Sequence, residues 1–528
     1  MQTTTVVRKT SARIKVLALL RNTLMGDVCM AAETLAAMLF FLLGQEIAGA
    51  VAFVFWISLK LVLCSDTFSA FHPFLLVGLM VLRLYDSYDL FMGMKYLLGV
   101  PAVLAVLFHF FFYKKKPKKG KLTRGYLALS VALSVGGLFS LPAAHYFSGT
   151  ALYYTYGLGF GMLLLYSLFL RGEDEESALP LAERVTLSAV FCGLFSVFIV
   201  AVQYLLNLEL IADGWRFAVE KLSSVGNNLS TSILLTMPFC FFAARKGGAR
   251  GGVAFFTGVA EGIAAAFSLS RGGLIFGLAM CVFLIFHTLR ESEKTRPCNL
   301  WILAGMLLAC GTVGILFFGE IAELFREGLV VLGKRVKALF FAGAILCLLL
   351  TAYARYLFDL PQGKKKRAHL AAVGMLGVLG VILFAVFFDR LKPLLVRADY
   401  YRGNMMIIAA KNFGRYPIFG TGIGYRGLRE VYPNKQGMFG CYHCLPVQIV
   451  GSMGLVGAAA YLFMFHARVT LLRQGKPRDF CTAVFLSYAG ILWISLVDPG
   501  IFCPVVYGVQ LAVYFVAAEK GKNFSKSP

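Results

Sequence analysis

Long apolar runs separated by short polar or basic segments make up most of this chain. Each run covers about 17 to 23 residues, which is long enough to cross a bilayer as a helix. The predicted fold class is therefore all-α, a polytopic membrane protein with about 14–16 transmembrane helices and a large outer-face loop. The runs lie near residues 27–43, 49–64, 68–85, 91–113, 125–142, 151–170, 184–206, 228–244, 251–268, 272–288, 299–318, 337–357, 369–389, 445–466, 480–497 and 503–518.

Composition and charge indicate which partners the chain is suited to bind. Of the 528 residues, 59% are apolar and 15% are charged, a composition that would make a water-soluble domain of this size aggregate. The net charge of +24 raises nucleic-acid binding as a hypothesis, but the basic residues recur between apolar runs. This distribution is typical of cytoplasmic loops, so we expect the bilayer, and no nucleic acid, as a partner. The basic clusters lie at 114–124, 245–250, 290–296, 364–367, 468–478 and 520–526.

The basic clusters also orient the chain. Residues 1–26 are basic and have no convincing cleavage site, so we expect an uncleaved cytoplasmic tail before one helical membrane domain at 27–528. An even number of spans returns the C-terminus to the cytoplasm. Residues 320–335 have apolar positions at helical spacing, which fits either an interfacial helix or a solvated connection. The outer face then holds the segments 207–227, 268–272, 319–336 and 390–444.

The outer segment 390–444 is polar and rich in arginine. A loop of this length between membrane helices is usually functional. Its middle, Tyr416–Gly424, contains proline and glycine, which enforce a tight, irregular backbone. Arginine forks suit phosphate groups, so the loop is a candidate site for a phosphate-bearing substrate beside the membrane. The arginines are Arg390, Arg397, Arg402, Arg415, Arg426 and Arg429.

His443 closes this loop and takes or gives a proton near neutral pH. A lone histidine is more often structural than catalytic, although an outer loop shared with Arg402 favours function. Cys441 and Cys444 bracket it, and a pair at this spacing forms a disulfide or binds metal. Because no second cysteine pair accompanies them, we expect no metal site.

Two shorter segments also carry candidate chemistry. Arg271, within Ser268–Gly273, interrupts two apolar runs, and a charge at membrane depth is functional by default. The adjoining glycines favour an anion site near a helix N-terminus, whereas the alternative is an arginine that extends to the interface. Asn227 and Asn228 open another run and either cap the helix, the commoner case, or hydrogen-bond a sugar.

Three of these pieces resemble the O-antigen ligase and polymerase-like family of bacterial membrane glycosyltransferases, and they occur in the family's order. The first is Gly226-Asn227-Asn228, with Asn228 where the family usually has proline. The second is Ser270-Arg271-Gly272. The third runs from Arg402 through Pro417-Ile-Phe-Gly420-x-Gly422-x-Gly424 and His443 to Gln448 and Gly454-Leu-Val-Gly457.

The resemblance covers residues 184–466, and the chain departs from the family pattern within it. Met406 stands where the family commonly has tryptophan, and Cys444 and Ser452 replace a common asparagine and a common glutamate. An additional helical pair between 299 and 389 separates the second piece from the third. These departures affect the expected acceptor rather than the expected fold.

The resemblance implies a fold similar to type C glycosyltransferases and transfer of a glycan from an undecaprenyl-diphosphate carrier. The acceptor is a lipid or glycan hydroxyl on the outer face of the bacterial inner membrane, as in lipopolysaccharide and other cell-envelope polysaccharide biosynthesis. Family members need no metal, nucleotide sugar or other cofactor. Arg271 and Arg402 would stabilise the diphosphate leaving group, and His443 would accept the acceptor's proton. The expected substrate-binding residues are Asn227, Asn228, Ser270, Arg397, Arg415 and Gln448.

Two other functions compete with a ligase or polymerase. A transporter, such as a flippase for lipid-linked glycans, predicts internal repeats and ionisable groups deep within several spans. The sequence has no obvious repeat, and its ionisable groups are expected on one face, which favours the enzyme. A glycan-binding membrane protein without catalytic activity is the third option.

Overall fold

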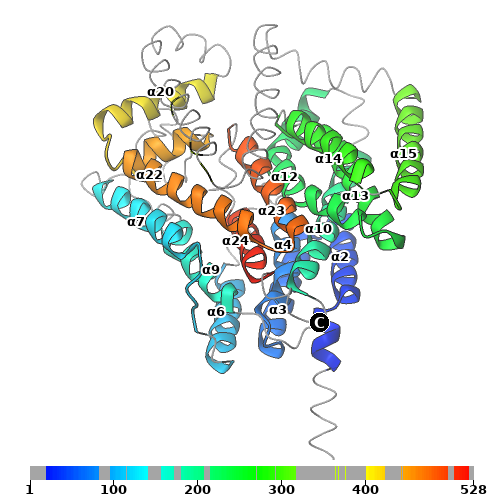
Figure 1. The fold of residues 1–528 in the computed structure, drawn as a ribbon, viewed down its shortest axis with the longest axis horizontal. Coiled ribbons are helices and arrows are strands. Elements are labelled where there is room, and N and C mark those ends of the chain that lie inside the picture. The colour runs from blue at the N-terminus through cyan, green and yellow to red at the C-terminus, as the bar shows by residue number, and fades with distance from the viewer. Residues whose placement is uncertain are drawn as a thin grey trace, which may run out of the picture.

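A computed structural model gives the structure of the chain. It describes residues 19–81, 95–113, 116–140, 156–171, 180–206, 215–268, 270, 272–291, 293–316, 363, 367, 375, 400–422, 442, 444–496 and 505–521. Every regular element in these residues is a helix (Figure 1). The elements are α2 (Asp27–Leu42), α3 (Glu46–Leu63), η1 (Thr67–Ala70), α4 (Phe71–Val81), α6 (Lys95–Phe112), α7 (Thr123–Ser140), η4 (Gly157–Gly161), α9 (Met162–Arg171), α10 (Leu181–Leu206), α12 (Trp215–Ala244), α13 (Gly248–Phe267), η5 (Gly273–Gly277), α14 (Leu278–Glu291), α15 (Arg296–Leu316), α20 (Tyr400–Arg415), α22 (Leu445–Gln474), α23 (Arg478–Ile494) and α24 (Val505–Lys520).

The all-α prediction is confirmed for these residues, and each predicted span within them corresponds to a helix. Five helical segments are long and apolar enough to cross a membrane, and a bent pair makes up to six. These helices identify a polytopic membrane protein and support part of the predicted number of spans. The five are Glu46–Leu63, Leu181–Leu205, Gly273–Glu291, Arg296–Leu316 and Leu445–Gln474.

The surface of α15 explains why the bundle needs a lipid environment. Large apolar side chains such as Trp301, Leu308 and Ile315 are exposed along this helix, which packs on α13 and α14. In Figure 1 it stands at the right-hand edge of the bundle. An apolar surface of this extent is unfavourable in water and favourable against acyl chains.

One end of the bundle gathers the described basic clusters. Arg250 pairs with Asp27 at 2.7 Å, Lys246 with Glu183 at 3.3 Å, and Arg245 with Glu291 at 2.8 Å. These pairs join the α12–α13 turn to the beginnings of α2 and α10 and the end of α14. The Lys121 Nζ donates to Gln474, which ends α22, and its backbone N–H donates to Glu519 near the end of α24.

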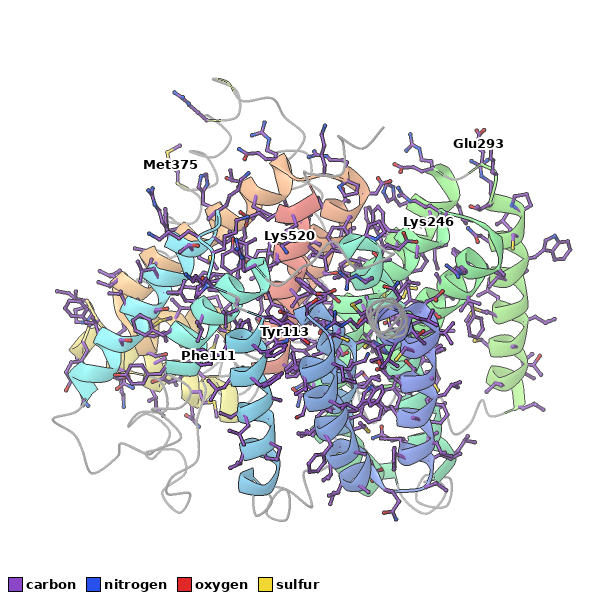
Figure 2. All side chains as sticks on the ribbon, turned by 90° about the horizontal axis from the view of Figure 1, so that it is seen from below. Phe111, Tyr113, Lys246, Glu293, Met375 and Lys520 are labelled. Atoms are coloured by element: carbon purple, nitrogen blue, oxygen red, sulfur yellow. The ribbon has the colours of Figure 1, made fainter. Side chains whose placement is uncertain are left out.

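We call this the basic end, defined by Lys121, Arg245, Lys246, Arg250 and the helix ends that they contact. Lys246 and Lys520 are labelled in the view of the molecule from below (Figure 2). Exposed ion pairs contribute little stability. Here they show that these helix ends lie close together. The clusters share one side of the bundle, as the alternation of basic and apolar segments predicts.

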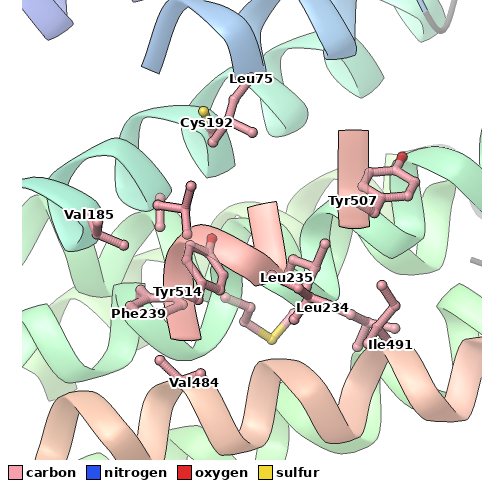
Figure 3. Packing of buried hydrophobic residues seen from close by; sticks show 14 of the residues in the cluster. Leu75, Val185, Cys192, Leu234, Leu235, Phe239, Val484, Ile491, Tyr507 and Tyr514 are labelled. Atoms are coloured by element: carbon pink, nitrogen blue, oxygen red, sulfur yellow. The ribbon is translucent and has the colours of Figure 1, made fainter. Parts of the chain in front are cut away.

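The core lies where α10, α12, α13, α23 and α24 pack together. Phe239 of α12 stacks obliquely against Tyr514 of α24, with ring centres 4.5 Å apart. Figure 3 shows Leu234 and Leu235 of α12 near Ile491 of α23, and Phe239 beside Tyr514. Near the basic end, the Arg468 guanidinium lies between Tyr488 and Phe515, each 5.1 Å from it. Cation–π contacts thus tie α22 to α23 and α24.

The expectation that ionisable groups gather on one face is wrong for several residues. Lys60 of α3 and Glu33 of α2 form a buried ion pair at 2.6 Å. Glu261 is fully buried in α13, where the Thr236 hydroxyl donates to it. A single sequence did not reveal them because each lies in a predominantly apolar run and its partner comes from another helix, an opposite charge for Lys60 and Glu33 and a hydroxyl for Glu261. Asp66 and Arg184 form a further buried pair.

The end of the predicted basic tail, 1–26, is helical and packs on the bundle. Leu19–Met25 is helical and meets α2 at a 53° bend. Leu24 and Met25 are buried beside Cys64, which explains why this segment packs on the bundle. Other predictions lie outside the described residues, namely most of the tail, the segment 320–335 and the spans 337–357 and 369–389, apart from the isolated position 375.

Candidate functional site

The first two sequence pieces meet through their side chains. The Ser270 hydroxyl donates to the Asn227 carboxamide oxygen at 2.6 Å, across an intervening helix, α13. Asn227 lies well inside α12, so the prediction that it might cap a helix is wrong. The Ser270 hydroxyl oxygen also accepts from the Gly273 backbone N–H at 3.1 Å, at the start of η5. One short segment thus ends α13, starts η5 and holds Asn227.

Small residues make this approach possible. The Ser230 and Ser268 hydroxyls are 2.8 Å apart between α12 and the end of α13. A Cβ added to Gly273 would lie 2.1 Å from the Ser230 Oγ, so only glycine fits there. Ser268 and Gly273 belong to a segment that the sequence marks as a candidate, and the fold brings both against Ser230 of α12. Arg271 stands between Ser270 and Gly272 in the chain and lies outside the described residues.

The third piece fits into a break in α22. Gly454 has φ +60° and ψ −154°, which interrupts the helix and frees backbone groups. Leu455 and Val456 donate their N–H groups to the carbonyl oxygens of Pro417 and Ile418, at 2.9 and 3.0 Å. In return the loop donates two bonds to α22, Thr421 N–H to the Gly451 oxygen and Gly422 N–H to the Ser452 oxygen, at 3.2 and 2.8 Å. The segment 417–422 therefore supplies hydrogen-bond partners for the backbone groups at the kink in α22.

Gln448 holds the segment on either side of His443. Its carboxamide oxygen accepts from the Tyr442 backbone N–H at 2.8 Å, and its NH₂ group donates to the Ser452 hydroxyl at 2.6 Å. Gln448, a predicted substrate-binding residue, is buried, and both of these hydrogen bonds go to the protein. The Tyr442 hydroxyl accepts from Asn412 of α20 at 2.9 Å. His443 itself lies outside the described residues.

The segment predicted as an irregular outer loop contains the helix α20. Met405, Ile408 and Ala409 recur at helical spacing and pack on Tyr442, which gives this polar segment a buried face. The loop prediction overlooked this short apolar stripe because charged and polar residues surround it. Arg415 ends the helix and is exposed.

Several other site predictions fall on undescribed positions. Arg402 belongs to the first turn of α20, but its side chain is not described. Arg397, Arg426 and Arg429 lie wholly outside the described residues. Cys444 is buried, whereas Cys441 lies outside the described residues. Within the described part of the chain, no three His, Cys, Asp or Glu side chains group as metal ligands would.

The end of α23 joins the third piece to the second. The Leu445 N–H, two residues after His443, donates to the Ser495 carbonyl at 2.6 Å. Trp493 packs on Phe276 of η5, with ring centres 5.4 Å apart. We call this region the motif end, defined by Asn227, Ser270, Leu445, Trp493 and Ser495.

The beginning of α24 also reaches the motif end. The Tyr507 hydroxyl donates to the Asn228 carbonyl oxygen. Neither Tyr507 nor Trp493 belongs to a motif, so only the packing of α23 and α24 identifies them. Asn228 thus contacts protein through its backbone.

No model of a protein family, no curated protein and no solved structure matches this chain. The assignment of function therefore depends on the motif residues and on their convergence.

The Gly420 position tests the fit between the motif loop and α22. Gly420 has φ +69°, and an added Cβ would lie 2.3 Å from the Ser452 carbonyl carbon. We expect Gly420→Ala to lower the free energy of unfolding by at least about 1–2 kcal/mol. Thermal unfolding in detergent measures the change.

Gly414→Ala is the matched control, because Gly414 is helical and has no neighbour within 4 Å of an added Cβ. It should be neutral or stabilise the protein by up to about 1 kcal/mol. Equal losses of stability in both variants would contradict a specific fit of the loop into the kink.

Proposed function

We propose that this protein is a membrane glycosyltransferase of the O-antigen ligase or polymerase-like type. It would move a glycan from an undecaprenyl-diphosphate carrier to an acceptor hydroxyl. The observation that carries the proposal is the convergence of three separated motif pieces at one end of the bundle. The Ser270–Asn227 hydrogen bond joins two of them, and the Leu445–Ser495 bond with the Trp493–Phe276 contact brings in the third.

The orientation follows from charge. We propose that the basic end faces the cytoplasm, because lysine and arginine are enriched in cytoplasmic connections. The motif end then faces outward in the bacterial inner membrane, where lipid-linked glycans are presented. The overall arrangement would be that of a type C glycosyltransferase.

The proposed chemistry assigns different roles to the motif residues. Arg271 and Arg402 would face the diphosphate, whose negative charge grows as the glycosidic bond breaks. Guanidinium groups bind such oxygens in pairs and need no metal. His443 would take the proton of the attacking hydroxyl. Gln448 and Ser270, whose hydrogen bonds go to the protein, would position these groups.

A transporter of lipid-linked glycans is the second candidate. The buried Glu33–Lys60 pair and the buried Glu261 favour it, because ionisable groups inside several helices are typical of transporters. Reconstituted protein separates the two functions. An enzyme transfers glycan in detergent solution, whereas a transporter moves the lipid-linked glycan across an intact bilayer without changing it.

Cysteine labelling tests the orientation. On a cysteine-depleted background, a cysteine at position 415 should react with a membrane-impermeant thiol reagent in intact cells. A cysteine at position 246 should react only after the cells are opened, because Lys246 is exposed on the basic end. The reverse pattern would exclude the proposed orientation.

Substitution of the two motif arginines tests the proposed diphosphate site. Arg271→Ala and Arg402→Ala should each lower glycan transfer by at least about a hundredfold, because each removes a preorganised cation. Lysine should restore little, since it lacks the guanidinium fork. Transfer is measured with purified protein and lipid-linked oligosaccharide isolated from the host.

Arg250→Ala is the control for these variants, because Arg250 is exposed at the basic end and pairs with Asp27. It should keep normal transfer. An arginine whose alanine variant matches wild-type activity does not belong to the site.

His443→Gln distinguishes a general base from a structural histidine. Glutamine keeps one hydrogen bond but takes up no proton, so transfer should fall by at least about a hundredfold while carrier-lipid binding persists. Cys441→Ser and Cys444→Ser should have much milder effects. The assay contains EDTA, and loss of wild-type activity under EDTA would contradict a metal-free reaction, just as normal turnover by His443→Gln would contradict the general base.

A further inference from the structure

His72 of α4 is buried among polar groups that the proposed glycan site does not use. Its Nε2 lies 3.1 Å from the Met30 carbonyl oxygen, which can only accept, so this nitrogen carries the ring hydrogen. The Nδ1 is then the acceptor, and it faces the Ser188 hydroxyl at 3.0 Å and the Cys192 thiol at 3.8 Å. The imidazole therefore has a donating side toward α2 and a basic side toward α10.

Beyond the Cys192 thiol, which lies on the basic side, there is a small cavity with a partly polar lining. The cavity has a volume of about 10 Å³, enough for about one water molecule. Its polar lining comes from three helices, with Cys192 on α10, Ser232 on α12, and Tyr507 and Gln510 on α24. Figure 3 shows Cys192 beside Leu75, with Tyr507 on α24. Because the Tyr507 hydroxyl donates to the Asn228 carbonyl oxygen, this polar region continues to the motif end.

The donating side faces charged groups near the basic end. Thr34, whose hydroxyl lies 3.0 Å from His72 Nε2, follows Glu33 along α2. Glu33 and Lys60 both act electrostatically on His72, and they are 2.6 Å apart. Cys29, which is only partly buried, donates to Glu33 at 3.4 Å and lies two residues from Asp27 at the basic end.

We propose that His72 is the centre of a proton relay that crosses the membrane domain, from the motif end through the small polar cavity to the Glu33–Lys60 pair. A proton reaching Nδ1 forms one N–H bond. The ring then releases the Nε2 proton toward α2, so that one N–H bond breaks and the ring ends neutral in its other tautomer. The Glu33 carboxylate, which is paired with Lys60, accepts that proton and becomes neutral. It then releases a proton toward the basic end, which restores the ion pair. The relay begins at the motif end, which it shares with the proposed glycan-transfer site, but it requires no glycan transfer.

Proton movement in liposomes tests this relay. The full-length protein is reconstituted with an internal pH-sensitive dye, the external pH is stepped, and potassium with valinomycin clamps the membrane potential. Wild-type protein should speed internal pH equilibration over protein-free liposomes. His72→Gln and Tyr507→Phe should each lower the protein-dependent rate by at least about tenfold, a conservative figure for loss of a proton-transferring group.

Two variants control for nonspecific effects. His287→Gln changes a histidine that pairs with Glu291 near the basic end, and Tyr204→Phe removes a hydroxyl that donates to the Phe267 carbonyl at 2.8 Å. Both should keep the wild-type rate. If His72→Gln does not fold, Tyr507→Phe decides, because it preserves the ring volume. No protein-dependent proton movement in wild type, or a wild-type rate in both relay variants, would overturn the proposal.

Discussion

Inside a bilayer, each backbone and side-chain polar group must find its partner within the protein, and much of this structure follows from that constraint. The break at Gly454 frees backbone groups in α22, and the Pro417–Gly422 segment supplies four hydrogen bonds there. The same requirement accounts for the buried Glu33–Lys60 pair, in which one charge is neutralised by a neighbouring helix. Non-helical backbone and charge thus occur where another element satisfies them.

Two kinds of residue occur at the motif end. Some hold protein segments together, whereas others would react with the substrate under the proposed function. Ser270, Gly273 and Gln448 use their polarity or small size to bind other protein segments. Arg271 and His443 stand beside them in the chain. Their described neighbours in the chain, Ser270 and Tyr442, are held by hydrogen bonds to other helices. Under the proposed function, such a frame would help to position the groups that act on a charged lipid substrate.

The interior of the bundle also contains polar and charged side chains. The α2–α3–α4–α10 group contains His72, Lys60 and Glu33, whereas the motif pieces belong to α12, η5 and α22. Tyr507 is the point of contact between the two regions, since it lines the small cavity and bonds to α12. Packing of α24 therefore joins the motif end to the buried polar groups around His72.

The sequence by itself determined the helical class and the positions of the helices, because apolar length in a bilayer leaves few alternatives. It also predicted that the basic clusters lie on one side, and it identified Asn227 and Ser270 as candidate site residues, which are hydrogen-bonded to each other. It did not reveal α20, whose apolar stripe of Met405, Ile408 and Ala409 is short and acquires meaning only against Tyr442. Nor did it reveal the interior ion pairs or the role of Gln448, since these depend on partners brought near by tertiary packing. Local patterns fix which segments enter the membrane, whereas contacts between distant helices decide which polar groups are paired there.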